Sequence, residues 1–336
     1  MRLHLRPKPR CRQSNCDSRR LPVPGLGRKH EARYPTSVST STPRRLLLRL
    51  QATCNNRCDH CTVGDLRELP DRPTEALINA LSSGREEGCT EVVFLRGEPT
   101  IREDFLSLCR SARSHEYRRI QVQTNGRMFA VDDFLARSRD AGLTHAESSL
   151  YGPDAGIHDA IARAPGAFEQ STLGLEQLAG ANMLVQVNVP IVEANVQHLA
   201  NIVEHVADRG APCVQFNFQR PIPGNPRSEL RLKTCVEPLS QAIDVGTRRG
   251  VQVKTEAFPL CLLPPGSECP SDAWDEASAP PLLIDDLQRR TRDIVALRAA
   301  YRGQPEVCAG CAVNARCPTT WAGYFDAHGS AELTPF

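Results

Sequence analysis

Three cysteines in one short segment are the residues whose types and spacing point most directly to chemistry. Cys54, Cys58 and Cys61 follow a C-x3-C-x2-C spacing, directly after the apolar segment 45–50. A [4Fe–4S] cluster that stores electrons normally has four cysteine ligands. Three thiolates would leave one iron without a protein ligand, and that iron could hold another molecule, as an open catalytic metal does. The segment therefore predicts an iron–sulfur cluster with one open iron.

Two other interpretations of this segment are a zinc site and three neighbouring cysteines that share no metal. Structural zinc usually takes four ligands in paired C-x2-C arrangements. His60 would have to be the fourth ligand, but it lies between Cys58 and Cys61 in the sequence. So short a loop can hardly fold the His60 ring onto the same ion, which counts against zinc.

Apolar segments that indicate strands alternate with helical patterns from Arg44 onward, which is typical of βαβ units around a parallel sheet. The expected strands are 45–51, 90–95, 119–123, 144–150, 183–190 and 213–218, followed by a short strand at 251–254. The expected helices are 73–88, 102–116, 131–141, 167–181, 195–209 and 232–249. Four glycines fall where a helix should end in a left-handed residue: Gly88, Gly142, Gly180 and Gly210. The count predicts a partial (βα)6 TIM-like barrel, whose chemistry should gather at the carboxyl ends of the strands.

Polar motifs follow four of these strands in order. The first strand ends at the three cysteines, the second at Arg96-Gly97-Glu98-Pro99, the third at Thr124-Asn125-Gly126 and the fourth at Ser148-Ser149-Leu150-Tyr151-Gly152. This series resembles the radical S-adenosylmethionine (SAM) superfamily over about residues 44 to 320, and the second motif looks like the family's Gly-Gly-Glu-Pro. One departure is that Arg96 stands where the family has its first glycine.

The resemblance implies that the three cysteines bind a [4Fe–4S] cluster whose open iron chelates SAM. One electron, supplied by a flavodoxin or ferredoxin, would cleave SAM and give a 5′-deoxyadenosyl radical that abstracts a substrate hydrogen. The resemblance also implies SAM contacts at the strand ends, at Gly97, Glu98, Asn125, Ser149 and Asn188. For Glu98, the alternative is an exposed acid at a turn. For Asn125 the alternative is an ordinary turn residue, and for Ser149 and Asn188 it is a core residue whose polar atoms are already hydrogen-bonded. Tyr151 and His158 are candidates for an acid/base role, but surface packing is the preferred interpretation of both.

A second group of cysteines lies near the carboxyl end. Cys308, Cys311 and Cys317 are spaced C-x2-C-x5-C, and Cys261 is the expected fourth ligand, with Cys269 as its competitor. Four thiolates permit either zinc or a fully ligated [4Fe–4S] cluster. The pattern resembles the SPASM or twitch auxiliary domains of radical SAM enzymes, which implies one auxiliary cluster. Trp321 and Tyr324 are expected to pack this cap against the barrel.

The composition is ordinary for a globular protein. The chain has 336 residues, of which 40% are apolar and 24% charged. No apolar run approaches the roughly 18 residues that cross a bilayer, and clustered thiols predict a cytoplasmic location. Residues 1–45 carry 12 Lys/Arg and 2 Asp/Glu, whereas the remainder of the chain carries 29 Lys/Arg and 37 Asp/Glu. Because the body is acidic, the charge distribution counts against a nucleic-acid partner.

We therefore expect three regions: a disordered basic tail (1–43), for which a recognition arm is the alternative, a radical SAM partial barrel (44–255) and a small cysteine-rich auxiliary-cluster extension (256–336). The expected activity is modification of a peptide or natural product through a substrate radical. The alternatives are tailoring of a small-molecule sugar or nucleoside by an epimerase, dehydrogenase or decarboxylase, and a non-catalytic iron–sulfur or zinc protein.

Overall fold

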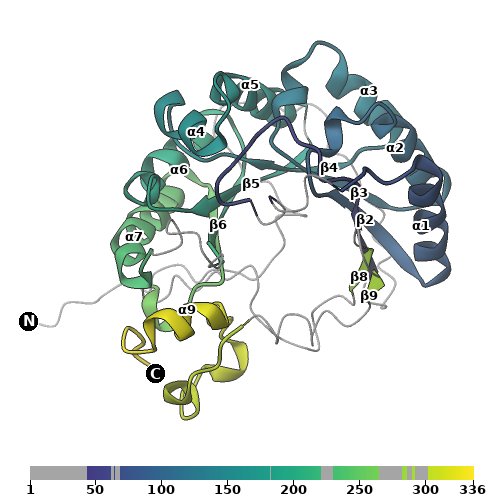
Figure 1. The fold of residues 1–336 in the computed structure, drawn as a ribbon. Helices are drawn as coiled ribbons and strands as arrows, with labels where there is room; N and C mark the ends of the chain where they lie inside the picture. Colours follow the sequence, from purple (N-terminus) through teal and green to yellow (C-terminus); the bar gives the residue numbers. More distant parts are fainter. Residues whose placement is uncertain are drawn as a thin grey trace, which may run out of the picture.

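The computed structural model describes most of the chain from Arg44 onward (Figure 1). The described residues are 44–61, 64, 69–181, 183–220, 230–264, 282–285, 290–291 and 302–336. Two sequence predictions lie outside them: the basic tail at 1–43 and Cys269 as the alternative fourth ligand.

Seven parallel strands follow one another across a curved sheet in the order β7-β6-β5-β4-β3-β2-β1. Their bounds are β1 (Arg44–Arg49), β2 (Cys89–Leu95), β3 (Arg119–Thr124), β4 (His145–Ser149), β5 (Leu184–Ile191), β6 (Cys213–Phe218) and β7 (Gln252–Glu256). Because every neighbouring pair is parallel, all seven carboxyl ends lie on one edge of the sheet. That edge is where chemistry is expected in a parallel barrel.

Helices cover the outer side of this sheet (Figure 1). They are α1 (Thr74–Glu86), α2 (Phe105–Ser114), α3 (Phe134–Ala141), α4 (Ala155–Ala162), α5 (Ala167–Gly180), α6 (Leu199–Asp208) and α7 (Leu232–Arg249). Helix α6 shows why they pack there. Its buried residues Leu199, Ile202, Val203 and Val206 recur at the three- and four-residue spacing of one helix face.

The two faces of the sheet differ in polarity. In β6, Val214, Phe216 and Phe218 are buried in the core, whereas the alternating Gln215 and Asn217 are half-buried. The strands β5 and β7 alternate in the same way. Successive side chains of a strand point to opposite faces, so the apolar set packs under the helices and the polar set lines the inner face.

The α/β class and the parallel open sheet of a partial barrel are confirmed, while two local predictions are wrong. Helix α4 was not expected, because its eight residues are short for a periodic pattern. Gly180 ends α5 without a left-handed backbone. The other three glycines do have positive φ, of 88°, 115° and 76° at Gly88, Gly142 and Gly210.

Two further strands extend the sheet beyond β1. Strand β8 (Leu282–Asp285) pairs parallel to β1, and β9 (Arg290–Thr291) pairs antiparallel to β8. Neither was expected, and β8 pairs with a strand at the opposite end of the described chain. The short strand expected at 251–254 is β7, the seventh parallel strand.

The carboxyl-terminal segment packs against the β6 side of the sheet, where α9 (Ala322–His328) lies in Figure 1. Tyr324 is 1% exposed, and its ring centroid is 5.5 Å from that of Phe218. Trp321 Nε1 donates to the Phe218 carbonyl at 2.7 Å. The packing role expected for both aromatic residues is confirmed. Among the described helices, none has the length and apolar character needed to span a membrane.

Candidate iron–sulfur and SAM site

The three-cysteine loop follows β1 at the carboxyl edge of the sheet. The Cys61 amide donates to the Cys58 carbonyl at 3.2 Å, and the Asn56 amide donates to Cys54 Sγ at 3.4 Å, so the loop turns tightly. Burial raises the pKa of the Cys54 thiol to about 12, and the charges of Cys58 and Cys61 act in the same direction. The tight turn keeps the three thiols in one short loop, where they could face a single cofactor.

The turn after β2 supports this loop through its backbone. The Glu98 amide donates to the Thr53 carbonyl at 2.9 Å, and the Gln51 side-chain amide donates to the Thr53 and Glu98 carbonyls at 3.0 and 2.8 Å. Gly97 lies between them with φ +59°, and a Cβ there would be 2.3 Å from the Thr53 oxygen. Only glycine allows so close an approach. Gly97 therefore lets the turn after β2 contact the cysteine loop, because it has no side chain.

Arg96, the departure from the family motif, keeps a glycine-like backbone. Its φ is +74°, in the left-handed region that glycine adopts readily. Burial lowers the pKa of Arg96, the negative charge of Cys61 raises it and the positive charge of Arg220 lowers it. The substitution therefore preserves the turn and brings a guanidinium near the cluster loop.

Glu98 is buried, with 1% exposure, and it joins β2 to β3. Its Oε1 accepts from Thr100 N, Thr100 Oγ1 and Thr124 Oγ1 at 3.1, 2.5 and 2.7 Å, and its Oε2 accepts from Asn125 N at 2.6 Å. Burial raises the pKa of Glu98, and these hydrogen bonds oppose the rise. The alternative of an exposed acid at a turn is wrong. A carboxylate has about four acceptor positions, so a ligand ammonium would find its acceptor at Oε2, which carries one bond.

Asn125 also binds the cluster loop. Its Nδ2 donates to Asn55 Oδ1 at 2.6 Å, and its Oδ1 accepts from Arg127 N at 3.1 Å. Arg127 Nη1 donates to the Asn55 carbonyl and to Asn56 Oδ1, both at 2.7 Å. The strand end expected to contact SAM thus also holds the segment between Cys54 and Cys58.

Ser149 and Asn188 are register partners on β4 and β5. Asn188 Oδ1 accepts from Asn217 Nδ2 on β6. The two residues are half-buried at the inner face of the sheet, where a ligand over the strand ends would meet them. The structure therefore brings them to the same edge as the cysteine loop.

Further polar residues of the inner face were missed by the sequence reasoning. Gln215 Nε2 donates to Asn217 Oδ1 at 2.8 Å and to Glu256 Oε2 at 3.0 Å. Arg302, from the carboxyl-terminal segment, lies 3.9 Å from Glu256 and 4.1 Å from the Trp321 ring centroid. The signal that could have found Gln215, Asn217 and Glu256 is polar alternation with period two inside apolar strands.

Tyr151 and His158 are not at the surface, so the packing role assigned to them there is wrong. Their exposures are 6% and 1%. Tyr151 Oη lies 3.5 Å from Cys58 Sγ, and its ring centroid is 4.9 Å from that of His60. His60, whose pKa burial lowers to about 4, therefore packs edge-on against Tyr151 beside the cysteine loop.

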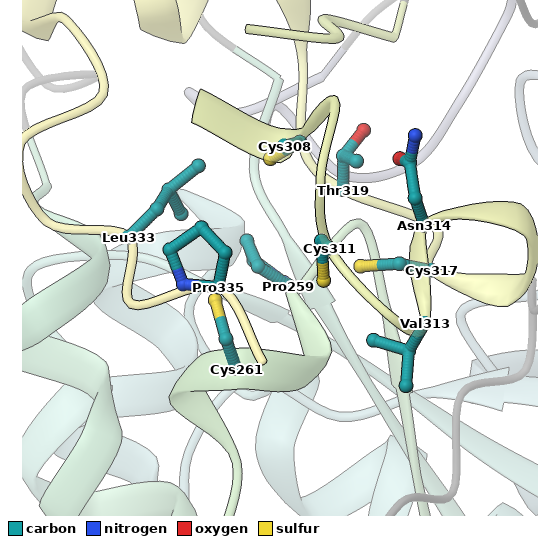
Figure 2. Close-up of a pocket in the computed structure, with 10 residues that line it drawn as sticks. All are labelled: Pro259, Cys261, Cys308, Cys311, Val313, Asn314, Cys317, Thr319, Leu333 and Pro335. Atoms are coloured by element: carbon teal, nitrogen blue, oxygen red, sulfur yellow. The ribbon is translucent and has the colours of Figure 1, made fainter. Parts of the chain in front are cut away.

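The second cysteine group lines one pocket, shown in Figure 2. Cys261 comes from the turn η6 (Leu260–Leu262), whereas Cys308, Cys311 and Cys317 come from the carboxyl-terminal segment. Burial raises the pKa values of Cys261, Cys308 and Cys317, and the charges of the other cysteines raise them further. Four thiols from two distant segments thus share one neighbourhood.

The described side chains form no ready site for a single metal ion. A tetrahedral zinc ion with Zn–S bonds of about 2.3 Å holds its sulfurs roughly 3.8 Å apart. Across the part of the chain that the structure describes, no three Cys, His, Asp or Glu side chains lie near enough to hold one metal ion. A [4Fe–4S] cube is larger than an ion and spaces its ligands farther apart. A cluster with an open iron at the three-cysteine loop and a fully ligated cluster in the four-cysteine pocket stay predictions.

Known proteins share this fold and parts of this sequence. The family model of the Radical SAM superfamily matches residues 48–206. The AdoMet-dependent heme synthase of Oleidesulfovibrio alaskensis is 29% identical over 184 residues, which are 53% of this chain and 46% of the relative. The mycofactocin maturase MftC of Mycolicibacterium smegmatis is 27% identical over 198 residues, which are 56% and 47% of the two chains. The chain spans about half the length of these curated relatives.

A solved structure agrees over a longer part of the chain. Streptococcus suis SuiB bound to the precursor peptide SuiA superposes with a TM-score of 0.63 at 12% identity, covering 88% of this chain and 75% of SuiB. At that identity the likeness concerns the fold alone.

Fold and site together define a partial-barrel protein with clustered thiols at the carboxyl edge of a parallel sheet. Residues 48–206 match the radical SAM superfamily, and one relative of the chain is named as an AdoMet-dependent enzyme, a heme synthase.

Proposed function

We propose that this protein is a radical SAM enzyme that modifies a peptide or natural product through a substrate radical. The observation that carries the proposal is the three-thiol loop, held at the carboxyl edge of the sheet by the turn around Gly97 and by Asn125. Cys54, Cys58 and Cys61 would hold the cluster, which in its reduced form would supply the electron for cleavage of SAM to a 5′-deoxyadenosyl radical.

The chain's own residues would bind, orient and shield the reactants. Glu98 offers an acceptor at Oε2 for the methionine ammonium, next to the cysteine loop. Ser149 and Asn188 would meet SAM at the strand ends, and the sheet, its helices and the carboxyl-terminal cap would exclude water from the radical. An external flavodoxin or ferredoxin is the proposed reductant.

The second cysteine group is proposed to hold an auxiliary [4Fe–4S] cluster in a SPASM- or twitch-like extension, which we place at residues 256–336. The pocket of Cys261, Cys308, Cys311 and Cys317 supports this assignment. A cluster there would accept an electron from a substrate radical, which suits an oxidised product.

The polar inner face favours a substrate with several hydrogen-bonding groups. Gln215, Asn217 and Asn188 carry carboxamides, which can both donate and accept hydrogen bonds as peptide groups do. The maturase among the relatives supports a maturation reaction of this kind.

The experiment is anaerobic reconstitution of the full chain with iron and sulfide, followed by SAM and dithionite. We expect 5′-deoxyadenosine in the wild type and none in Cys58→Ala, with an unchanged far-ultraviolet circular dichroism spectrum. Wild-type protein that forms a cluster but yields no 5′-deoxyadenosine would reject the proposal and favour a non-catalytic iron–sulfur protein.

A second candidate is tailoring of a small molecule, which the match to AdoMet-dependent heme synthases favours. Mass spectrometry separates the two candidates. A mass change in a co-expressed short peptide supports the first, and a change in a tetrapyrrole, sugar or nucleoside supports the second.

A further inference from the structure

Tyr151 touches the cysteine loop through its hydroxyl. Tyr151 Oη lies 3.5 Å from Cys58 Sγ, within hydrogen-bonding distance for sulfur, although the two residues are 93 positions apart in sequence. The side chain is 6% exposed. Nothing assigned so far to cluster or SAM binding uses this contact.

The chemistry of the two groups decides which one donates once a metal is bound. A cysteine that binds iron is a thiolate, so Cys58 Sγ can then only accept. A phenol with a pKa near 10 keeps its proton at neutral pH, so Tyr151 donates. The separation of 3.5 Å from Cys58 Sγ places the Tyr151 proton within reach of the sulfur.

The backbone of Tyr151 is fixed at both ends. Its N–H donates to His158 Nδ1 at 3.1 Å, and its carbonyl accepts from Asn195 Nδ2 at 2.9 Å. These bonds also set the tautomer of His158, because an Nδ1 that accepts leaves the ring proton on Nε2.

The ring of Tyr151 is held between two imidazoles. It stacks on His158 with centroids 4.9 Å apart and an interplanar angle of 29°, and His60 packs against it at 4.9 Å and 71°. A donor this constrained is pre-organised, so little conformational entropy is lost when its hydrogen bond forms.

We propose that Tyr151 is a positioning residue whose O–H···S hydrogen bond to Cys58 raises the reduction potential of the SAM-binding cluster. The inference rests on the proposed function. Hydrogen bonds to cluster sulfurs are a main determinant of cluster potential. Reduction adds one negative charge, and a hydrogen bond strengthens with the charge on its acceptor, so the bond favours the reduced state. The electron comes from the external reductant, and Tyr151 keeps its proton throughout.

The test is a redox titration of reconstituted full-length protein without SAM, followed by EPR of the reduced cluster. The cluster in question is recognised by the change of its signal when SAM is added afterwards. Tyr151→Phe removes the donor and keeps the ring. We expect the reduction equilibrium to move about tenfold toward the oxidised cluster, a potential lower by about 59 mV for one electron.

Tyr117→Phe is the matched control. Tyr117 is also buried, at 4% exposure, and its hydroxyl donates to the Leu81 carbonyl at 2.8 Å. The Tyr117→Phe variant should lose stability without a change in cluster potential. This result would separate a general packing effect from the proposed effect of the Tyr151 hydrogen bond on the potential. Equal potentials for wild type and Tyr151→Phe would overturn the inference.

Two further outcomes are distinguishable. If the wild type assembles a SAM-responsive cluster and Tyr151→Phe has the same cluster potential as the wild type, this inference alone is contradicted. If the wild type assembles no such cluster, the proposed function is contradicted. Should Tyr151→Phe fail to assemble, site-specific replacement of Tyr151 by 3-fluorotyrosine decides. Its stronger donor should raise the potential, and an unchanged potential would refute the role.

Discussion

Replacing Gly97 by alanine should separate the cluster loop from the end of β2. The new Cβ would lie 2.3 Å from the Thr53 oxygen and 3.0 Å from the Gln51 oxygen. The left-handed backbone at φ +59° costs alanine about 1–2 kcal/mol. Moving the loop away also breaks the Glu98–Thr53 backbone bond and the two bonds of the Gln51 amide. At about 1 kcal/mol per bond, and with the backbone cost added, the expected loss in free energy of unfolding is about 4–5 kcal/mol.

Gly166→Ala is the control for this loss. Gly166 has φ +78°, yet a Cβ there meets no atom within 4 Å, so it bears only the backbone cost of about 1–2 kcal/mol. The assay is urea unfolding of anaerobically reconstituted protein, followed by circular dichroism, with iron content measured on the same samples. Only Gly97→Ala should lose iron, because only it displaces Cys54. Equal stability losses and equal iron contents in the two variants would refute the idea that this turn positions the loop.

Three other predictions concern separate parts of the molecule. Burial raises the pKa of Glu147 above its ordinary 4.5, so the stability it contributes is fully present below that value and is lost as pH rises through the raised pKa. Glu147→Gln should flatten the fall in unfolding free energy above pH 4.5 in urea titrations, and an unchanged slope would contradict this. Cys311→Ser should lower the iron content from about eight to about four per chain while 5′-deoxyadenosine production persists, whereas full iron content would argue against the auxiliary cluster. Tyr324→Phe removes a hydroxyl that accepts from Leu232 N and donates to Glu332. It should cost about 1–3 kcal/mol by urea unfolding, and a variant as stable as the wild type would mean that this hydroxyl does not anchor α9.

Local periodicity made most of the barrel predictable. Strand β6 (Cys213–Phe218) and helix α7 (Leu232–Arg249) match the expected 213–218 and 232–249, because apolar alternation and an amphipathic pattern mark them within a few residues. Strand β8 was missed for the opposite reason. Its place depends on pairing with β1, and no local pattern encodes a partner so distant in the chain.

The candidate site shows the same division. The spacing of Cys54, Cys58 and Cys61 predicts a shared metal centre from one segment alone, and this stays a prediction. The hydroxyl contact between Tyr151 and Cys58 joins two loops of the sheet edge, so it depends on the register of strands and could not be derived from spacing.

Arg96 illustrates what a motif departure means physically. The sequence shows only that a side chain replaces the family's glycine. The structure shows that Arg96 accepts φ +74°, a conformation that costs an L-residue about 1–2 kcal/mol. The turn is thus kept, and the negative charge of Cys61 acts to raise the pKa of Arg96, against the lowering by burial.

The central claim is that Cys54, Cys58 and Cys61 hold a cluster whose fourth iron is open to SAM. The most direct measurement is EPR of the reconstituted, dithionite-reduced protein with and without SAM. We predict a reduced-cluster signal that changes when SAM binds, and loss of that SAM-responsive signal in Cys58→Ala. A wild-type signal that SAM leaves unaltered would show that the fourth iron is closed, and the account would be wrong.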